Sequence, residues 1–449
     1  MGEYKSMVEA PTGWLGSIPE HWECKKIGSL FSERKTKVSD ADYPPLSVTK
    51  LGIVPQLANA AKSDSGDNRK LVCSGDFVIN SRSDRKGSCG VSELAGSVSL
   101  INIVLTPRNS WDNKYVHYLM RSQSFSEEYY HYGRGIVADL WTTRYSEMKN
   151  ILLPVPPHDE QEQIVRFLDW KVSGINKLIN IKKKEIKKVT ELKKTVVNEA
   201  VTRGLNPNVP MKDSGVEWLG DIPSHWKTYR CKYLFSERDE RSIEGKEQHL
   251  SMSQKYGLVP DTILDERRML SESYAGGKIC YENDLVLNRL KAHLGVFSLA
   301  PQMGVISPDY TVLIPRIERI IPAYAEAVLK SQKCRRELRV RVKGVTEGFW
   351  RLYTDSFNTI VLPVPPVEEQ KSIMDEIKLF EEKTANYISV ILKEVEVLHE
   401  LRNKLISDVV TGQIDVRDIE VPEFEFVDEI EDESDEDTDE ENDNADEEE

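Results

Sequence analysis

The sequence lacks several features that would each assign it to a class of proteins. It has no run of about 20 apolar residues, which excludes a membrane-spanning helix. Its first residues, Met1 to Lys5, lack the apolar stretch of a signal peptide, so we expect a cytoplasmic protein. The six cysteines are scattered without a CxxC pair, which argues against structural zinc and against a disulfide framework.

Sequence motifs for catalysis are also absent. There is no GxxxxGK[ST] phosphate loop, no Rossmann GxGxxG, no HExxH and no GxSxG. The Asn-Pro-Pro-aromatic tetrapeptide of amino-methyltransferases does not occur, and the eight histidines never cluster at ligand spacing. We therefore expect a chain without catalytic residues, without a metal and without a cofactor of its own.

Basic residues are missing from the end of the chain. Residues 418–449 hold 20 Asp or Glu and no Lys or Arg, so the net charge of -15 arises there. Residues 1–417 hold 55 acidic and 60 basic side chains and are mildly basic. A segment dominated by one sign of charge cannot bury enough apolar surface to fold, which predicts a disordered tail. The tail is interpreted first as a solubilising extension, and second as a polyanion that competes with nucleic acid.

What the chain does contain is a long internal repeat. The segment Trp14–Trp22 returns as Trp218–Trp226 with seven of nine positions identical, and Leu-Phe-Ser-Glu-Arg recurs 204 residues after its first copy at Leu30. Leu-Pro-Val-Pro-Pro at Leu153 recurs at Leu362, an offset of 209. A period of about 200 residues is far too long for a solenoid. The repeat therefore indicates two similar modules that bind two similar targets.

Each repeat divides into a mixed module and a long helix. Strand-like pieces at 76–79 and 99–105 recur at 284–288 and 310–314, and glycines lie between them. A short amphipathic helix is expected near the end of each module, over Asn113 to Tyr132 and over Pro322 to Val342. We predict α+β modules, each with a twisted sheet and flanking helices.

The proline-rich segment that closes each module is expected to be extended, because proline cannot continue a helix or a central strand. Apolar residues then recur in alternating steps of four and three, which is typical of a coiled coil. In the first repeat these residues are Leu168, Val172, Ile175, Ile179, Ile186, Val189, Val196 and Ala200, and in the second Ile377, Thr384, Ile388, Ile391, Val395, Leu398, Leu405 and Val409. A lone helix with one apolar stripe is unstable in water, so we expect the two to pair, antiparallel and with an approximate two-fold axis.

These patterns predict five parts along the chain. They are a first module (1–157), a first long helix with its connector (158–212), a second module (213–366), a second long helix (367–416) and an acidic disordered tail (417–449).

Basic and polar side chains at corresponding places in both modules are the candidate binding residues. Lys and Arg near strand ends suit phosphate contacts and bidentate guanine recognition. For any single residue, an ordinary surface position is the better interpretation, but the set as a whole favours DNA contact. The candidates are Arg82, Arg85, Lys86, Arg134, Thr143 and Arg144 in the first module and Asn288, Arg289, Lys291, Arg341, Lys343 and Arg351 in the second.

This arrangement resembles the specificity subunit of type I restriction–modification enzymes over residues 14 to about 413. The resemblance is carried by the two WLGxIPxHW openings, the strand motifs at 76–82 and 284–289, and the PVPPxxEQ segments that end at Gln161 and Gln370. It implies that each module is a target recognition domain reading one half of a bipartite, asymmetric site in double-stranded DNA. The helices would set the spacer and dock two methyltransferase subunits.

The same resemblance implies further partners and places the chemistry in them. S-adenosylmethionine, ATP and Mg would be used by the methyltransferase subunits and by separate restriction and translocation subunits. Two other interpretations stay open. A stand-alone nuclease or methyltransferase would need motifs that are missing here, whereas a coiled-coil scaffold would assemble other proteins without selecting a DNA sequence.

Overall fold

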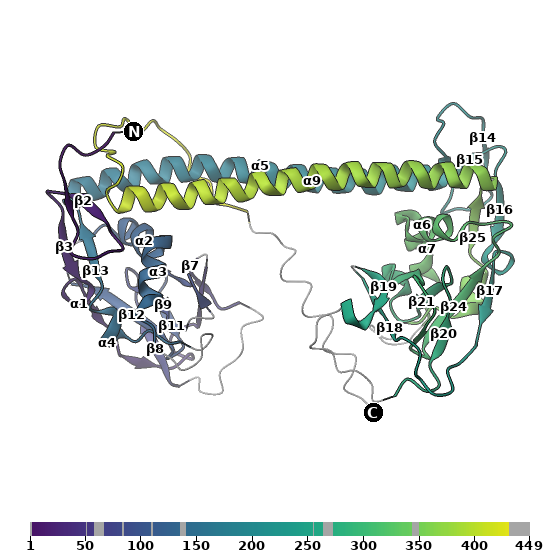
Figure 1. Ribbon diagram of the computed structural model, residues 1–449, viewed down its shortest axis with the longest axis horizontal. Coiled ribbons are helices and arrows are strands. Elements are labelled where there is room, and N and C mark those ends of the chain that lie inside the picture. Colours follow the sequence, from purple (N-terminus) through teal and green to yellow (C-terminus); the bar gives the residue numbers. More distant parts are fainter. Residues whose placement is uncertain are drawn as a thin grey trace. The chain divides into compact units, whose positions relative to one another are not determined.

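The chain folds into two compact units, each with part of both long helices. The computed structural model describes residues 2–50, 52–57, 67–82, 85–108, 111–134, 141–254, 256–263, 273–343 and 350–430. Unit 1 comprises residues 1–183 and 392–449, and unit 2 comprises residues 184–391. The long helices are α5 (His158–Arg203) and α9 (Val367–Val410), labelled in Figure 1. Within the described residues, no helix is long and apolar enough to cross a membrane.

Unit 1 contains short antiparallel strands and four short helices besides its share of the long ones. Its strands are β1 (Met7–Glu9), β2 (Ser17–Pro19), β3 (Glu23–Lys26), β4 (Phe31–Glu33), β5 (Lys37–Val38), β6 (Leu46–Thr49), β7 (Gly52–Pro55), β8 (Arg69–Val72), β9 (Phe77–Asn80), β10 (Cys89–Val91), β11 (Gly96–Val98), β12 (Asn102–Pro107) and β13 (Leu152–Val155). Its short helices are α1 (Ile27–Leu30), α2 (Asn113–Arg121), α3 (Gln123–His131) and α4 (Tyr145–Met148). The largest sheet runs in the order β10-β9-β12-β4, and a three-stranded sheet runs β11-β8-β5.

Unit 2 repeats this plan. Its strands are β14 (Met211–Asp213), β15 (Asp221–Pro223), β16 (Lys227–Arg230), β17 (Phe235–Arg238), β18 (Leu250–Ser253), β19 (Gly257–Pro260), β20 (Lys278–Cys280), β21 (Leu285–Asn288), β22 (Phe297–Leu299), β23 (Gly304–Ile306), β24 (Tyr310–Pro315) and β25 (Val361–Val364). Its short α-helices are α6 (Pro322–Lys330), α7 (Gln332–Arg341) and α8 (Thr354–Asn358). The sheet β17-β24-β21-β22 corresponds to β4-β12-β9-β10 of unit 1, which confirms the predicted α+β class and the duplication.

The helix expected near the end of each module is instead a pair of helices. Ser122 separates α2 from α3, and Ser331 separates α6 from α7. Each serine hydroxyl accepts a hydrogen bond from a backbone N–H in the first turn of the following helix, that of Phe125 at 3.3 Å and that of Cys334 at 3.4 Å. A serine in this position starts a new helix, and the apolar period alone does not reveal the break.

The closing Leu-Pro-Val-Pro-Pro segment lies in an edge position of a two-stranded ladder, β13 with β3 and β25 with β16. The glutamine that follows fixes the start of the long helix. Gln161 Nε2 donates to the Pro156 carbonyl at 2.9 Å, and its Oε1 accepts from the Asp112 N–H at 3.2 Å. Gln370 makes the equivalent bonds to the Pro365 carbonyl at 2.9 Å and from the Ile321 N–H at 2.8 Å. Each glutamine therefore ties the long helix to the loop before α2 or α6.

The repeated WLGxIPxHW motif also contacts the first turn of each long helix. His21 Nε2 lies 2.7 Å from Glu160, and His225 Nε2 lies 2.8 Å from Glu369. In unit 1 the same carboxylate accepts from the Tyr4 hydroxyl at 2.5 Å. The pKa of Tyr4 is raised, mainly by burial and secondarily by this bond to Glu160. Both histidines are thus structural partners of the Glu-Gln pair that begins each long helix.

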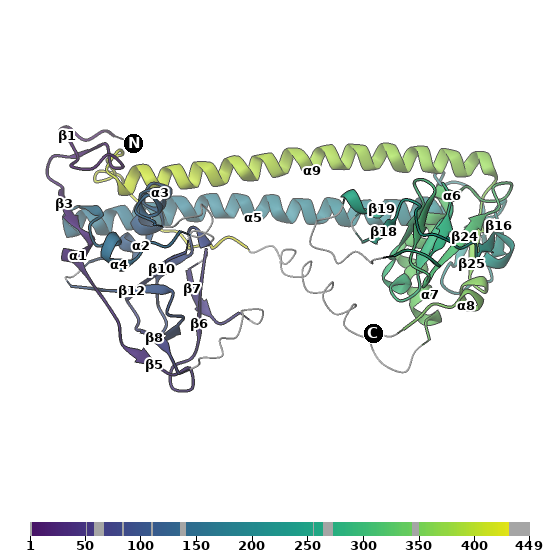
Figure 2. The same cartoon turned by 60° about the horizontal axis from the view of Figure 1, so that its bottom comes forward.

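The two long helices pack antiparallel within each unit, and Figures 1 and 2 show them side by side. In unit 1, Arg402 donates to the side chain of Asn176 at 2.6 Å, and Lys182 lies 2.8 Å from Glu394. In unit 2, Lys193 lies 3.0 Å from Glu381. The residues of both predicted stripes are all buried or half-buried. Lys182, Lys193 and Arg402 are charged residues within the apolar stripes. Because each bonds to a side chain of the facing helix, they do not break the coiled coil.

Each module also closes over the end of the long helix that belongs to the other repeat. In unit 1 the buried hydroxyl of Tyr115 donates to the carbonyl of Val410, at the end of α9, at 3.2 Å. In unit 2 Tyr324 donates to the carbonyl of Val201, near the end of α5, at 3.0 Å. The hydrophobic core of unit 1 accordingly includes Val409, Val410 and Val416, and that of unit 2 includes Ala200 and Val201.

The expected disordered tail differs from the structure over residues 417–430, which run beside α5 in unit 1 (yellow in Figure 2). Four side chains of α5 hold its backbone, with hydrogen bonds of 2.8–3.1 Å to the carbonyls of Glu425, Val427, Asp428 and Ile430. The donors are Ser173, Asn176, Asn180 and Lys183. We call residues 418–430 the strap. Residues 431–449, the remainder of the predicted tail, lie outside the described residues.

Acid is expected to loosen the strap. Burial alone raises the pKa of Glu429, but hydrogen bonds from Arg402, Lys183 and His399 outweigh it and lower that pKa to about 2. A carboxylate with a depressed pKa stabilises the folded state above its ordinary pKa, and this stabilisation is lost as the pH falls from about 4.5 to about 2. Cleavage by pepsin at Phe424 and Phe426 should therefore accelerate between pH 4.5 and pH 2.5.

The matched control is Glu429→Gln, which keeps the shape of the side chain but has no charge to lose. At pH 4.5 this variant should be cleaved faster than the unmodified chain, and the difference should narrow at pH 2.5. Equal cleavage of the two chains at pH 4.5, with circular dichroism unchanged, would show that Glu429 does not hold the strap.

Candidate nucleic-acid interface

A buried ion pair fixes the strand that leads into the candidate site of each unit. Asp76 is 1% exposed, and its carboxylate accepts from Arg34 at 2.8 and 3.0 Å and from the Thr106 hydroxyl at 2.8 Å. Asp284 accepts from Arg238 at 2.9 and 3.3 Å in unit 2. The bond to Asp76 raises the pKa of the Arg34 guanidinium. The repeated Ser-Glu-Arg and Asp motifs are thus parts of one structural pair.

Three chain segments meet where that strand ends. In unit 1 the Thr143 N–H donates to the Ser81 carbonyl at 2.9 Å, and Arg134 and Thr142 exchange backbone hydrogen bonds of 3.2 and 3.1 Å. In unit 2 the Leu352 N–H donates to the Arg289 carbonyl at 2.9 Å, and Lys343 and Arg351 exchange bonds of 3.0 and 2.9 Å. The segments that carry Arg82, Arg134 and Arg144 in unit 1 and Arg289, Lys343 and Arg351 in unit 2 therefore lie on the same backbone framework.

A basic cavity of about 740 Å³ opens at this framework in unit 1. Two of the predicted residues, Arg82 and Arg144, line it, and both are exposed. Three lysines that sequence reasoning missed, Lys35, Lys70 and Lys149, complete the basic lining. Five cationic side chains thus face one carboxylate, Glu33, which lies 3.3 Å from Lys35 and 3.5 Å from Lys70. This excess of positive charge suits a polyanion such as a nucleic-acid backbone.

The corresponding place in unit 2 carries a different set of charges. Arg289 lies 3.1 Å from Asp309, and Lys278 lies 3.6 Å from both Glu237 and Asp239. By the repeat offsets, Asp239 and Asn358 stand where unit 1 has Lys35 and Lys149. Because the side chains differ on the same framework, the two surfaces are suited to different sequences.

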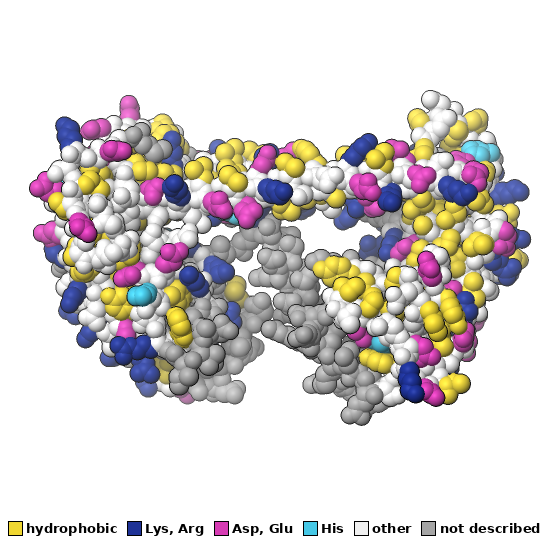
Figure 3. Space-filling model, viewed as in Figure 1, with side chains coloured by type: hydrophobic (Ala, Val, Ile, Leu, Met, Phe, Trp, Pro, Cys, Tyr) yellow, Lys and Arg dark blue, Asp and Glu magenta, His cyan; other side chains and the backbone are white. Residues whose placement is uncertain are grey.

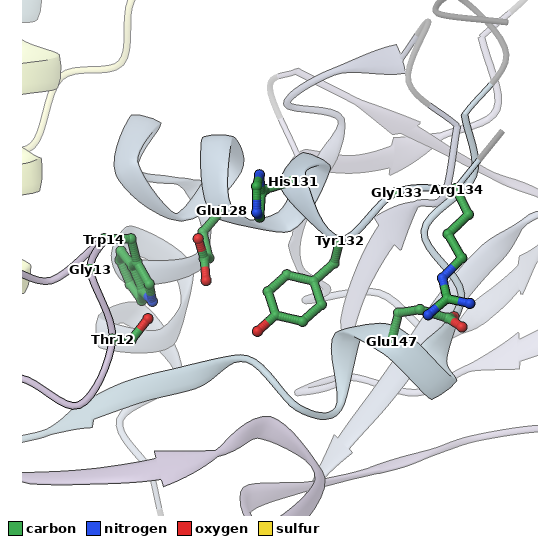
Figure 4. A pocket seen from close by; sticks show the side chains of 9 residues that line it. All are labelled: Thr12, Gly13, Trp14, Glu128, His131, Tyr132, Gly133, Arg134 and Glu147. Carbon is green, nitrogen blue, oxygen red and sulfur yellow. The ribbon is translucent and has the colours of Figure 1, made fainter. Parts of the chain in front are cut away.

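Arg134 lies at a second cavity of unit 1, of about 540 Å³, and not at the basic one. Figure 4 shows its guanidinium directed toward Glu147, and Glu128 lines the same cavity beside Trp14 and Tyr132. The pKa of Glu147 is lowered by a hydrogen bond from Ser146 and by the charges of Arg134 and Arg144. With two carboxylates in its lining, this cavity does not suit a polyanion.

The other candidate residues take varied positions. Thr143 is 1% exposed and its hydroxyl donates to the Tyr129 carbonyl at 3.1 Å, so its predicted contact with DNA does not fit this structure. The Asn288 side chain accepts from the Leu290 N–H at 3.1 Å and shapes the turn after β21. Arg341 pairs with Glu337 at 2.5 Å along α7. Exposed positions are held by Arg85, Lys86 and Lys343, whereas Lys291 and Arg351 are half-buried.

No metal centre is present among the residues that the structure describes, because no three His, Cys, Asp or Glu side chains are grouped to hold an ion. All six cysteines are free thiols. Burial raises the pKa of Cys89 to about 12, so this thiol stays protonated at neutral pH.

The long helices expose a second kind of surface, formed by apolar side chains outside the coiled-coil stripes. Figure 3 shows hydrophobic side chains (yellow) among charged ones on the visible face of the helices. These residues are each 43–60% exposed. They are Leu178, Ile181, Leu392, Val397 and Leu401 in unit 1 and Leu192, Leu379, Tyr387 and Val390 in unit 2. Three of them, Leu178, Ile181 and Leu192, lie on α5, and the other six lie on α9.

The similarity of this chain to known proteins extends over both modules and both long helices rather than over one module. The putative type I restriction enzyme MjaX specificity subunit of Methanocaldococcus jannaschii is 22% identical over 442 residues, which cover 90% of this chain and 96% of that protein. The MjaVIII specificity subunit of the same organism is 21% identical, over 90% of this chain and 95% of its own length. Over nearly its whole length, the chain is similar to type I restriction enzyme specificity subunits. The resemblance noted in the sequence is thereby confirmed.

A solved structure shows the same fold. A chain from work on complex assembly and conformational transition of the type I R-M system covers 88% of this chain and 99% of its own length, with a TM-score of 0.58 and 14% identity. No protein-family model matches the chain. The two modules and two long helices of this chain therefore share the fold of that solved chain.

Proposed function

We propose that this chain is the DNA-reading subunit of a type I restriction–modification complex and has no catalytic role itself. Each module would read one half of a bipartite, asymmetric site in double-stranded DNA. The observation that carries this proposal is the common backbone framework of the two modules, which presents Arg82 and Arg144 in one and Arg289, Lys343 and Arg351 in the other. Different side chains on one framework account for two different half-sites.

The long helices would set the spacer between the half-sites and dock two methyltransferase subunits. Their exposed apolar residues support this role, because a solvent-facing apolar surface is stabilised when a partner covers it. Methyl transfer would use S-adenosylmethionine bound by the methyltransferase subunits. ATP and Mg would serve the separate restriction and translocation subunits.

Replacing both Arg82 and Arg144 with alanine tests the proposal. A contact between arginine and phosphate or guanine contributes about 1–3 kcal/mol, so the pair should lower affinity for the cognate duplex about 30-fold or more. If both contact phosphates, the slope of log affinity against log salt should fall by about 2. Fluorescence anisotropy of the complex with its methyltransferase subunits measures both quantities, on sites identified by mapping methylated adenines in the source genome.

The matched control is Arg417→Ala, because Arg417 is paired with Asp415 at 2.7 Å in the same unit and does not line the basic cavity. This variant should bind within about two-fold of the unmodified complex. Equal affinity for all three proteins would remove the basic cavity from the DNA interface, and equal affinity for cognate and scrambled duplexes would favour a scaffold that reads no sequence.

A further inference from the structure

We propose that the acidic residues 431–449 bind the basic cavity of unit 1 when DNA is absent, and so compete with DNA phosphates. The competition with DNA rests on the proposed function, whereas the contact between the acidic residues and the cavity does not.

The strap brings the start of this segment to unit 1 and holds it there. Glu429 is bonded by Lys183 from α5 at 3.0 Å and by His399 and Arg402 from α9 at 2.9 and 2.6 Å. Asn180 binds the strap twice, because its Nδ2 donates to the Asp428 carbonyl and its Oδ1 accepts from the Ile430 N–H, both at 2.8 Å. The acidic segment therefore begins from a fixed point on the helices of unit 1.

This docking site is particular to unit 1. The repeat offset of 209 places Glu382, Ala385, Ser389 and Leu392 of α9 at the positions of Ser173, Asn176, Asn180 and Lys183. The amides and the lysine that hold the strap backbone have no counterparts there. One of the two repeats thus has a site that binds the backbone of the chain's own C-terminal segment.

Charge and length suit the contact with the basic cavity. Residues 431–449 contain 14 Asp or Glu and no Lys or Arg. These 19 residues can extend to at most about 65 Å. Tethering at residue 430 makes the contact intramolecular, which raises the effective concentration of the segment at the cavity. Five cations and one carboxylate, Glu33, line the cavity of unit 1, whereas Asp239 and Asn358 replace two of the lysines in unit 2.

Carbodiimide cross-linking tests the contact directly, because it joins a carboxylate to a lysine that touches it. In the full chain without DNA, we expect residues 431–449 to be linked to Lys35 and Lys149, and peptide mass spectrometry identifies the links. The triple variant Ser173→Ala, Asn176→Ala, Asn180→Ala should lower their yield because the strap is released. Links spread evenly over the lysines of both units would overturn the proposal.

DNA affinity tests the competition. Two variants are compared with the full chain: one ends at Ile430 and keeps the strap, and the other has all 14 acids of residues 431–449 changed to Asn or Gln. On a random duplex in 50 mM KCl, both should bind about 10-fold more tightly than the full chain. At 300 mM KCl the difference should fall below about two-fold, because salt screens the ionic contacts.

The two measurements separate the possible failures. If the variants bind no more tightly at 50 mM KCl, the competition is refuted. If cross-links to Lys35 and Lys149 form and a random duplex removes them, but the complex never distinguishes cognate from scrambled DNA, then the proposed function fails and the contact stands.

Discussion

Asp76→Ala should destabilise unit 1 by about 3 kcal/mol or more, because it leaves the Arg34 guanidinium without its partner inside the module. Removing one member of a buried ion pair costs about 3–5 kcal/mol, and the lower end applies because the Arg34 side chain is 24% exposed. For a unit of this size, the midpoint of thermal unfolding should fall by about 6–12 °C. Hydrogen exchange at the amides of β9 and β12 during heating measures the effect within unit 1.

The control is the double variant Arg34→Met, Asp76→Leu, which removes both charges and should recover most of the loss, since no buried charge remains unpaired. The equivalent variant of unit 2, Asp284→Ala, should lower protection at β21 and β24 while β9 and β12 stay protected. A midpoint for Asp76→Ala within 2 °C of the unmodified chain would mean that the pair contributes little.

Four residues inserted after Leu178, with four more after Leu398 in the facing part of α9, should change the spacing of the sites that the assembled complex methylates. Four helical residues add about 6 Å, equivalent to about two base pairs of duplex. Methylation of the original sites should fall about 100-fold or more, because a complex that engages only one half-site loses several base contacts, each worth about 1–3 kcal/mol. Sites with a longer spacer and the same half-sites should replace them.

The readout is methylation of a DNA library in which the spacer length varies and the half-sites are constant. As a control, the same four residues are inserted after Asn208, in the exposed connector between α5 and β14, where the helices keep their length. An unchanged spacer in the helix variant would contradict the ruler role. A shifted spacer in the connector variant would assign the spacing to the connector instead.

The long helices illustrate what the sequence reveals well. Their stripe positions are spaced by a simple period, and the burial of Leu168 and Ile179 in one helix and of Ile377 and Ile391 in the other follows it. The strap could not be predicted in this way. Its composition is that of a disordered segment, and its partners Asn176 and Asn180 are isolated amides whose purpose becomes visible only when the backbone beside them is known.

The candidate site was predictable in part. Arg82 and Arg144 lie far apart in the sequence, and the bond between Thr143 and Ser81 brings their segments together. Lys35 and Lys149 were missed because the other repeat has Asp239 and Asn358 at the corresponding positions. Thr143 was included wrongly because a threonine beside an arginine looks exposed in sequence, whereas its side chain is buried in the module.

The position of Val410 and Val416 in the core of unit 1 has a consequence for synthesis on the ribosome. Unit 2 is one continuous stretch of chain and can complete its core as soon as it has emerged. Unit 1 is made first but must wait for its last core residues, a delay of roughly 10–50 s at the usual rates of translation. During that interval the nascent N-terminal half is unfinished, so a chain stopped before residue 409 would carry one mature module and one that is open to chaperones and proteases.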